Sequence, residues 1–101
     1  MKVTKAREGA KMTVTIEGRL DTLASPDLEE ALETELEGLE TLVFDMTGLA
    51  YISSAGLRVL VNAAQFIETQ NGKMSTINVR EDLREIFEIT GLTNALGVEF
   101  Q

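Results

Sequence analysis

The hydrophobic pattern of this chain switches repeatedly between the period of a strand and the period of a helix. KMTVTIEGRL alternates apolar and polar residues, which is the pattern of a half-buried strand. TLVFDM is continuously apolar and favours a central strand covered on both faces. SAGLRVLVNAAQFIETQNG predicts a helix, because apolar residues recur with helical spacing at Leu57, Leu60, Val61, Ala64 and Ile67. Strand-like runs separated by helices predict an α/β fold.

Two more helices are predicted by their end signals. SPDLEEALETELEGL begins with Ser25 as its cap and ends near Gly38, and its leucines keep one face apolar. In INVREDLREIFEITGL, Asn78 followed by Glu81 forms an asparagine variant of a capping box, which is expected to open a helix. Gly91 is expected to close that helix, because glycine readily adopts the left-handed conformation that follows a helix end.

The remaining segments predict further strands. Val3 and the turn-prone REGAK predict a leading hairpin, KMSTINV predicts a later strand, and GVEF predicts a last one. The expected order is β-β-α-β-α-β-α-β, with parallel pairing through right-handed crossovers. We expect one domain over residues 1–101, a small sandwich of about four to five strands in a mixed sheet with three to four helices.

Composition excludes several kinds of site. The 101 residues include no cysteine and no histidine, so disulfides, thiol nucleophiles and the commonest general base and zinc ligand are absent. A net charge of −8 argues against binding a nucleic-acid backbone. No apolar run approaches the roughly 20 residues that span a bilayer, and the N-terminus lacks the apolar stretch of a secretory signal. We expect a cytoplasmic protein with no metal, cofactor, nucleic-acid partner or membrane insertion.

The segment DMTGLAYISSAG joins the predicted central strand to the predicted second helix. In α/β sheets, sites form beyond the carboxyl ends of strands, so Ser53 and Ser54 lie where free amides and the helix dipole favour negative charge. One interpretation is that one serine caps the helix and the other is incidental. The alternative is a phosphorylation site, whose added charge repels a partner without unfolding the protein. Both interpretations are open on the residues alone.

An enzymatic role has little support in this segment. Ser54-Ala55-Gly56 is half of the nucleophile elbow G-x-S-x-G, but Ile52 occupies the first glycine position. No histidine is present to activate a serine, and Leu57 stands where a serine–lysine pair needs its lysine. The chain has no Walker A loop and no G-x-G-x-x-G. We expect a protein that is not an enzyme, in which Gly56 permits close packing of the helix start.

Two aspartates end predicted strands. Asp21, in EGRLDTLASP, is explained most simply as a turn residue. If its strand and TLVFD share one sheet, the Asp21 loop lies near Ser53 and Ser54. Asp45, at the end of TLVFD, is expected to hydrogen-bond the loop backbone in a structural role.

Three segments together resemble the STAS domain family, and in particular the stand-alone bacterial anti-sigma factor antagonists. DMTGLAYISSAGLRVLV resembles the central strand, loop and helix of the family, EGRLDTLASPDL its G-x-L-D loop, and INVREDLREIFEITGL its C-terminal helix and turn. The three follow the family order and extend over nearly the whole chain. The resemblance implies a STAS-like fold and a protein-binding role in place of catalysis.

The resemblance also implies a partner-switching mechanism. Members bind an anti-sigma factor that is also a serine kinase, and this binding frees a sigma factor for transcription. The kinase phosphorylates a serine two positions before the motif glycine and so breaks the complex, which a phosphatase restores. Counting back from Gly56 gives Ser54, and the same matching makes Asp21 the loop aspartate near the phosphorylation site.

The chain departs from the family pattern beside this serine. Ser53 replaces the aspartate that often precedes the target, so Ser53 is the alternative phosphorylation site, and Ser54 is preferred on the family register alone. The resemblance implies partner binding around Asp21, Ser53, Ser54, Gly56 and Arg58. Arg58 either contacts the partner or a bound phosphate, or is a solvated helix residue.

Two other functions are considered. STAS domains also occur in anion transporters and lipid-transport complexes, so the chain is alternatively a subunit that docks on a transporter ATPase. A nucleotide-binding role is suggested by the helix N-terminus as an anion site. It has the least support, because no lysine or glycine-rich loop accompanies that terminus.

Overall fold

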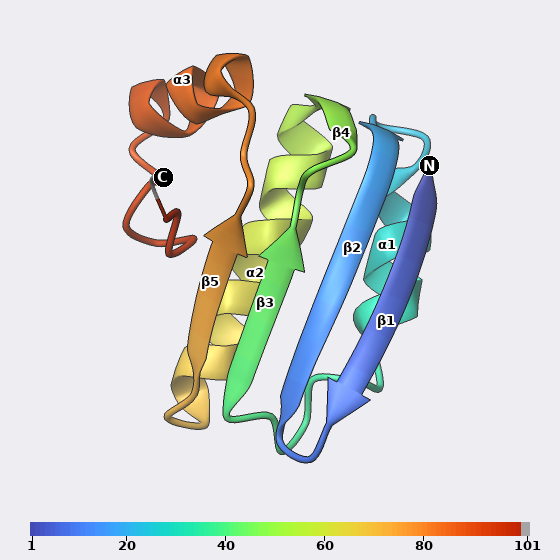
Figure 1. The fold of residues 1–101 in the computed structure, drawn as a ribbon, viewed down its shortest axis with the longest axis vertical. Coiled ribbons are helices and arrows are strands. Elements are labelled where there is room, and N and C mark those ends of the chain that lie inside the picture. Colours follow the sequence, from blue (N-terminus) through green and yellow to red (C-terminus); the bar gives the residue numbers. More distant parts are fainter. Residues whose placement is uncertain (100–101) are drawn as a thin grey trace.

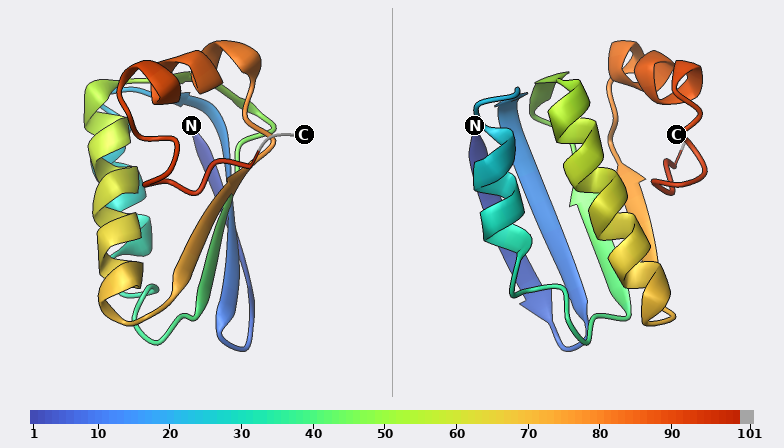
Figure 2. Two further views of the ribbon diagram at one scale, coloured as in Figure 1. Left: turned by 90° about the vertical axis from the view of Figure 1, so that its left-hand side faces the viewer. Right: turned by 180° about the vertical axis from the view of Figure 1, so that it is seen from behind.

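The computed structural model describes residues 1–99 as a five-stranded mixed sheet with three helices, which confirms the predicted α/β class. Helices α1 and α2 lie side by side on one face of the sheet, and α3 follows β5 (Figure 1; Figure 2). The elements in chain order are β1 (Lys2–Glu8), β2 (Lys11–Leu20), α1 (Ser25–Leu32), β3 (Thr41–Asp45), β4 (Leu49–Ile52), α2 (Ser54–Thr69), β5 (Lys73–Ile77) and α3 (Glu81–Ile89). Within residues 1–99, no helix is both long enough and apolar enough to cross a membrane.

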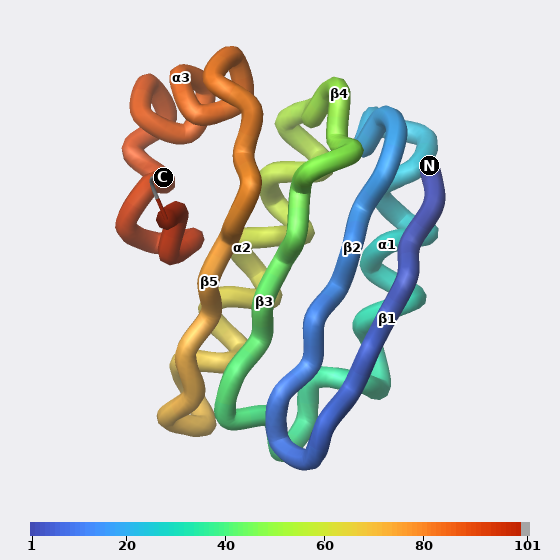
Figure 3. Tube along the Cα trace, in the orientation of Figure 1, coloured from blue at the N-terminus to red at the C-terminus, as the bar shows by residue number. Residues whose placement is uncertain are grey.

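The sheet combines one hairpin with parallel crossovers. Its order is β1-β2-β3-β5, with β4 paired to β2 off this path. β1 and β2 form the predicted antiparallel hairpin around a turn at Gly9 and Ala10, and β2–β3 and β3–β5 are parallel. The tube in Figure 3 shows the chain leaving β2, passing behind the sheet as α1 and returning as β3. Both parallel connections therefore place their helices on the same face.

Strand β2 is long enough to pair with two strands in succession. Residues 11–15 pair with β3, and residues 18–20 pair with β4, also in parallel. The register shifts between Gly18 and Arg19, where Gly18 has a φ of +94° that suits a residue without a side chain. β4 was not predicted, because a four-residue strand inside a connecting loop has too short a hydrophobic pattern to be recognised.

The core lies between the sheet and the helices α1 and α2. β3 alternates between buried and half-buried residues, so Val43 is only half-buried between Leu42 and Phe44. The expectation that both faces of this strand are covered is therefore wrong, since an apolar β-branched residue also suits an open sheet face. The largest fully buried side chains are Phe44, Phe87, Met12, Ile16, Leu20, Leu28, Leu39, Leu42, Met46, Leu49, Leu60 and Ile67.

The observed order of elements, β-β-α-β-β-α-β-α, also differs from the predicted one at the C-terminus. In place of a final strand, the structure has a single parallel bridge between Thr76 and Val98. Thr76 holds this segment with its hydroxyl, which donates to the carbonyl of Leu96 at 2.7 Å. The last part of the predicted GVEF strand, from Phe100, lies outside the described residues.

The predicted boundaries of α1 are wrong. Ser25 lies inside the helix and its hydroxyl donates to the carbonyl of Asp21 at 2.6 Å, so it caps no helix amide. The regular helix ends at Leu32 and not near Gly38, although Leu36 and Leu39 remain buried in the irregular segment that follows. Burial of apolar residues at helical spacing therefore continues beyond the hydrogen-bonded helix.

Of the two predicted boundaries of helix α3, the start is wrong and the end is confirmed. Asn78 adopts a left-handed φ of 58° and donates from Nδ2 to Asp45 Oδ1 at 3.1 Å, so it does not cap this helix. The end of the helix is as predicted. Gly91 has a φ of 73°, and the amide of Leu92 donates to the carbonyl of Phe87 at 2.8 Å.

Two phenylalanines allow a direct test of where the core lies. Phe44 on β3 is fully buried, whereas Phe66 on α2 is 44% exposed. We expect Phe44→Ala to lower the free energy of unfolding by about 3–5 kcal/mol, because it leaves a cavity. Phe66→Ala is expected to cost less than about 1 kcal/mol. Urea unfolding followed by circular dichroism measures both, and equal losses would contradict the assigned core.

Candidate functional site

Strands β2 and β4 bring the two predicted site loops together. Leu20, the last residue of β2, is paired with Ile52, the last residue of β4. Immediately beyond this pair, the amide of Ser53 donates to the carbonyl of Leu20 at 2.9 Å. The loop that begins at Asp21 and the serines that open α2 therefore start from adjacent residues at one end of the sheet, as predicted (Figure 1).

Ser53 is the cap of helix α2. Its backbone is extended, with φ −92° and ψ 170°, and its Oγ accepts a hydrogen bond from the amide of Gly56 at 3.1 Å. The residue is buried, with 8% of its surface exposed. The amide of Ser53 therefore joins the helix start to β2, and its hydroxyl oxygen caps the first turn of the helix.

Ser54 is the first residue of α2, and it is exposed to solvent. No hydrogen bond to its hydroxyl is found within residues 1–99, so the oxygen is accessible and not engaged in the fold. The helix N-terminus around it carries free amides and partial positive charge. A negatively charged group on this hydroxyl is therefore compatible with the local structure.

Gly56 determines how closely α2 approaches β2. The residue is buried, and a side-chain carbon placed on it would lie 2.7 Å from Leu20 Cγ and 2.9 Å from the Leu20 carbonyl oxygen. Neither distance is sterically allowed without movement of the strand or the helix. The predicted close packing of the helix start is confirmed, and it needs glycine at this position.

Asp21 shapes the loop between β2 and α1. Its Oδ1 accepts from the amide of Ala24 at 2.8 Å, and its carbonyl accepts from the amide of Ser25 at 3.0 Å. The carboxylate is half-buried. These bonds hold the loop in a tight turn, and at that turn Leu23 is 88% exposed.

Arg58 lies on α2, four residues after Ser54, and is exposed. Residues four apart on a helix share a face, so its guanidinium is within reach of a group carried on Ser54. The ion pairs found within residues 1–99 are Lys5–Glu35 and Arg80–Asp82, so Arg58 is in none of them. Also within this range, no three side chains of the metal-binding types gather into a site.

Asp45 belongs to a separate turn at the end of β3. It accepts from the amide of Thr47 at 3.0 Å, from Thr47 Oγ1 at 2.7 Å and from Asn78 Nδ2 at 3.1 Å. Partial burial tends to raise the pKa of Asp45, but these hydrogen bonds favour the charged form and together lower the pKa below its ordinary value. The structural role expected for Asp45 is confirmed by its bond to the loop backbone.

Leu23 and Tyr51 are surface residues near this site that were not predicted from the sequence. Tyr51 on β4 is 40% exposed, and the guanidinium of Arg19 lies 4.2 Å from the centre of its ring. These two residues are paired across β2 and β4. The available signal was the presence of large apolar and aromatic residues outside any periodic pattern, and this signal is weak for single residues.

The family model of the STAS domain matches residues 1–99. The chain belongs to the STAS domain family. A STAS relative from Bacillus subtilis (strain 168), named an anti-sigma-B factor antagonist, is 31% identical over 85 residues, which are 84% of this chain and 78% of the relative. The resemblance stated from the sequence is confirmed, and relatives of this STAS chain carry the name of anti-sigma factor antagonists.

Solved structures show the same fold. The Bacillus cell fate determinant SpoIIAA in its phosphorylated form has a TM-score of 0.78 at 16% identity, covering 99% of this STAS chain and 93% of SpoIIAA. The murine anion transporter Slc26a9 in its inward-facing state has a TM-score of 0.75 at 15% identity, covering 92% of this chain and 16% of the transporter. The STAS fold is thus shared by proteins of very different size.

The two serines are expected to differ in what they contribute to stability. Ser53→Ala removes a helix cap and should lower the free energy of unfolding by about 1 kcal/mol. Ser54→Ala alters an exposed residue and should change it by less than about 0.5 kcal/mol. Urea unfolding of both variants beside the wild type makes the comparison. A larger loss for Ser54→Ala would reverse the two assignments.

The lowered pKa of Asp45 predicts a dependence on pH. A carboxyl group with a depressed pKa in the folded state stabilises the fold fully above its unfolded pKa of about 4, and this contribution is lost as the pH falls through the lower folded pKa. Wild type should therefore exceed Asp45→Asn in stability at pH 7, and the difference should shrink below about pH 4. Urea unfolding across this pH range tests this, and a constant difference would contradict it.

Proposed function

We propose that this protein is an anti-sigma factor antagonist whose binding is switched off by phosphorylation of Ser54. It binds, in the bacterial cytoplasm, an anti-sigma factor that also acts as a serine kinase, and a phosphatase reverses the modification. Membership of the STAS family and the names of its relatives support the partner class. The protein then acts by binding and not by catalysis.

The observation that carries the choice of serine is the contrast between two neighbours. Ser53 is buried and uses its hydroxyl oxygen to cap α2, whereas Ser54 is exposed and its hydroxyl is outside the hydrogen-bond network of the fold. A kinase needs an accessible hydroxyl, and phosphorylating Ser53 would first require breaking the bond to Gly56. Burial and bonding therefore favour Ser54, independently of the family register.

The proposed switch changes the surface and leaves the fold intact. A phosphoserine adds a charge of about −1.5 to −2. At the start of α2 this charge meets a favourable helix dipole, and Arg58 is one helical turn away to pair with it. The chain already carries a net charge of −8, so further negative charge here repels acidic groups on a partner, and an apolar partner surface would have to remove water from the phosphate.

The proposed binding surface is centred on Ser54 and includes Arg58 on the same helix and the adjacent loop that begins at Asp21. Leu23, almost fully exposed on a loop held by hydrogen bonds of Asp21, adds an apolar contact to this surface. Ser53 and Gly56 belong to the proposed site as its support, because both are buried where α2 joins β2. A partner that contacts this surface covers the hydroxyl of Ser54, so bound protein is protected from phosphorylation.

The second candidate function is a subunit that docks on the ATPase of a transporter. A fold like that of this chain also forms part of a murine anion transporter, so the fold is compatible with a role beside a transporter. Co-purification of the protein with membranes and an ATPase, unaffected by changes at Ser54, would support docking in preference to the switch.

A comparative pull-down tests the proposed function. The baits are wild type, Ser54→Ala, Ser54→Asp and, as a matched control for added charge, Thr69→Asp at the other end of α2. Captured proteins from the native host are identified by mass spectrometry. We expect wild type, Ser54→Ala and Thr69→Asp to retain one partner with a kinase-type ATP-binding domain, and Ser54→Asp to lose at least about 90% of it, since repulsion at a buried contact costs several kcal/mol.

Each outcome has a defined meaning. Equal capture by all four baits would show that charge at Ser54 does not control binding, and would leave the docking function. Loss of the partner with Thr69→Asp as well would mean that binding responds to net charge and not to the position of Ser54. Circular dichroism of the four purified baits confirms that they are equally folded.

A further inference from the structure

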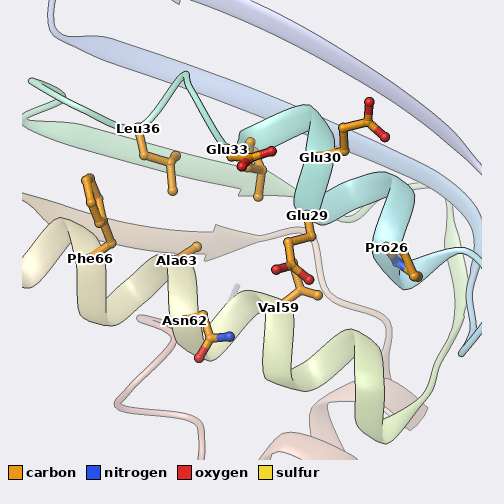
Figure 4. Close-up of a pocket in the computed structure, with 10 residues that line it drawn as sticks. Pro26, Glu29, Glu30, Glu33, Leu36, Val59, Asn62, Ala63 and Phe66 are labelled. Atoms are coloured by element: carbon orange, nitrogen blue, oxygen red, sulfur yellow. The ribbon is translucent and has the colours of Figure 1, made fainter.

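A groove runs between α1 and α2 on the helical side of the molecule, and we name it the helix groove. Its volume is about 570 Å³, and its apolar floor is formed by Leu32 of α1 and Val59 and Ala63 of α2. Leu36 and Phe66 line it as well (Figure 4). Ser54 is not among the lining residues, so the helix groove is separate from the proposed phosphorylation site.

The apolar part of the helix groove extends onto the surface at Phe66. Its ring stands up from α2 toward the segment that carries Leu36 (Figure 4). The side chain is 44% exposed, whereas Leu36 and Val59 are each 8% exposed. An exposed aromatic ring beside an apolar floor forms a continuous patch, and aromatic residues in such pockets commonly anchor a bound protein.

One side of the helix groove is strongly acidic. Glu29 of α1 points toward Val59 of α2, Glu33 lies just beyond the end of α1, and Glu30 points away from α2 (Figure 4). No lysine or arginine lines the groove, and none of these three carboxylates takes part in an ion pair found within residues 1–99. Lys5 and Arg7 lie nearby, but they donate to the carbonyls of Ala31 and Glu35, so the carboxylates that line the groove have no cationic partner within it, in a molecule whose net charge is −8.

We propose that the helix groove binds a basic, amphipathic segment of a partner protein. An apolar side chain of that segment packs against Val59, Ala63 and Phe66, and its lysines or arginines pair with Glu29 and Glu33. The carboxylates disfavour a second copy of this chain, because two such grooves brought together place like charges face to face. They disfavour nucleic acid for the same reason.

The test uses a synthetic amphipathic helix of leucine and lysine, with a leucine–glutamate helix of the same pattern as its control. Fluorescence anisotropy measures affinity for the full chain, and two-dimensional amide NMR spectra locate the binding. We expect the lysine peptide alone to bind, with shifts concentrated on α1 and on residues 59–66 of α2. Raising the salt concentration should weaken the binding, because exposed charges are screened.

Matched variants separate the helix groove from general negative charge. Glu29→Gln with Glu33→Gln should weaken binding by about tenfold, and Phe66→Ala by a similar factor, as expected for exposed ion pairs and one apolar anchor. Glu85→Gln with Glu88→Gln removes the same charge from exposed positions on α3 and should change affinity less than about twofold.

Several results would overturn the proposal. The first is an equal loss of peptide affinity in the two double variants. The others are binding of the leucine–glutamate helix, no binding of either peptide, and amide chemical-shift changes spread outside the groove. Analytical sedimentation of the chain alone tests whether a second copy of this chain occupies the groove. Self-association that Phe66→Ala abolishes would make a second copy the occupant, and would also overturn the proposal.

Discussion

The close contact between the end of β2 and the start of α2 is the constraint on which the rest of the site depends. The Leu20 carbonyl accepts from the Ser53 amide, and Gly56 leaves no room for a side chain between the helix and Leu20. This contact fixes the first turn of α2 relative to the sheet. It turns Ser54 outward and sets it beside the loop that begins at Asp21. Buried backbone contacts thus fix the position of the surface around Ser54 that we propose a partner binds.

The two neighbouring serines have different roles: Ser53 stabilises the helix start, and Ser54 is the proposed site of regulation. The cap contributed by Ser53 keeps the helix N-terminus formed whether or not Ser54 carries a phosphate, and the dipole of that terminus tolerates the added charge. A modification at Ser54 then alters what a partner meets without altering the fold. The helix groove lies along the flank of the same helix, where apolar residues of α2 face the acidic residues of the α1 side, so α2 takes part in two chemically different surfaces.

The fold could be predicted where local pattern and tertiary contacts agree. α2 was recognisable because its apolar residues recur with helical spacing, and Leu57, Leu60 and Ile67 are indeed buried. β4 was not recognisable, because its pairing with residues 18–20 depends on a register shift far away in the chain. Asn78 was assigned to a cap on local grounds, but Asp45, 33 residues earlier, provides its side chain with a tertiary partner.

The site was predicted in its position and in part in its detail. The adjacency of Asp21 to the serines followed from the strand order, but which serine is buried required the geometry of α2. The central claim is that Ser53 supports the fold and Ser54 carries the switch. The most direct measurement is to phosphorylate the purified protein with its captured kinase partner and locate the phosphate by tandem mass spectrometry. The account predicts phosphate on Ser54 in wild type and none on Ser54→Ala, whereas phosphate on Ser53 would contradict it.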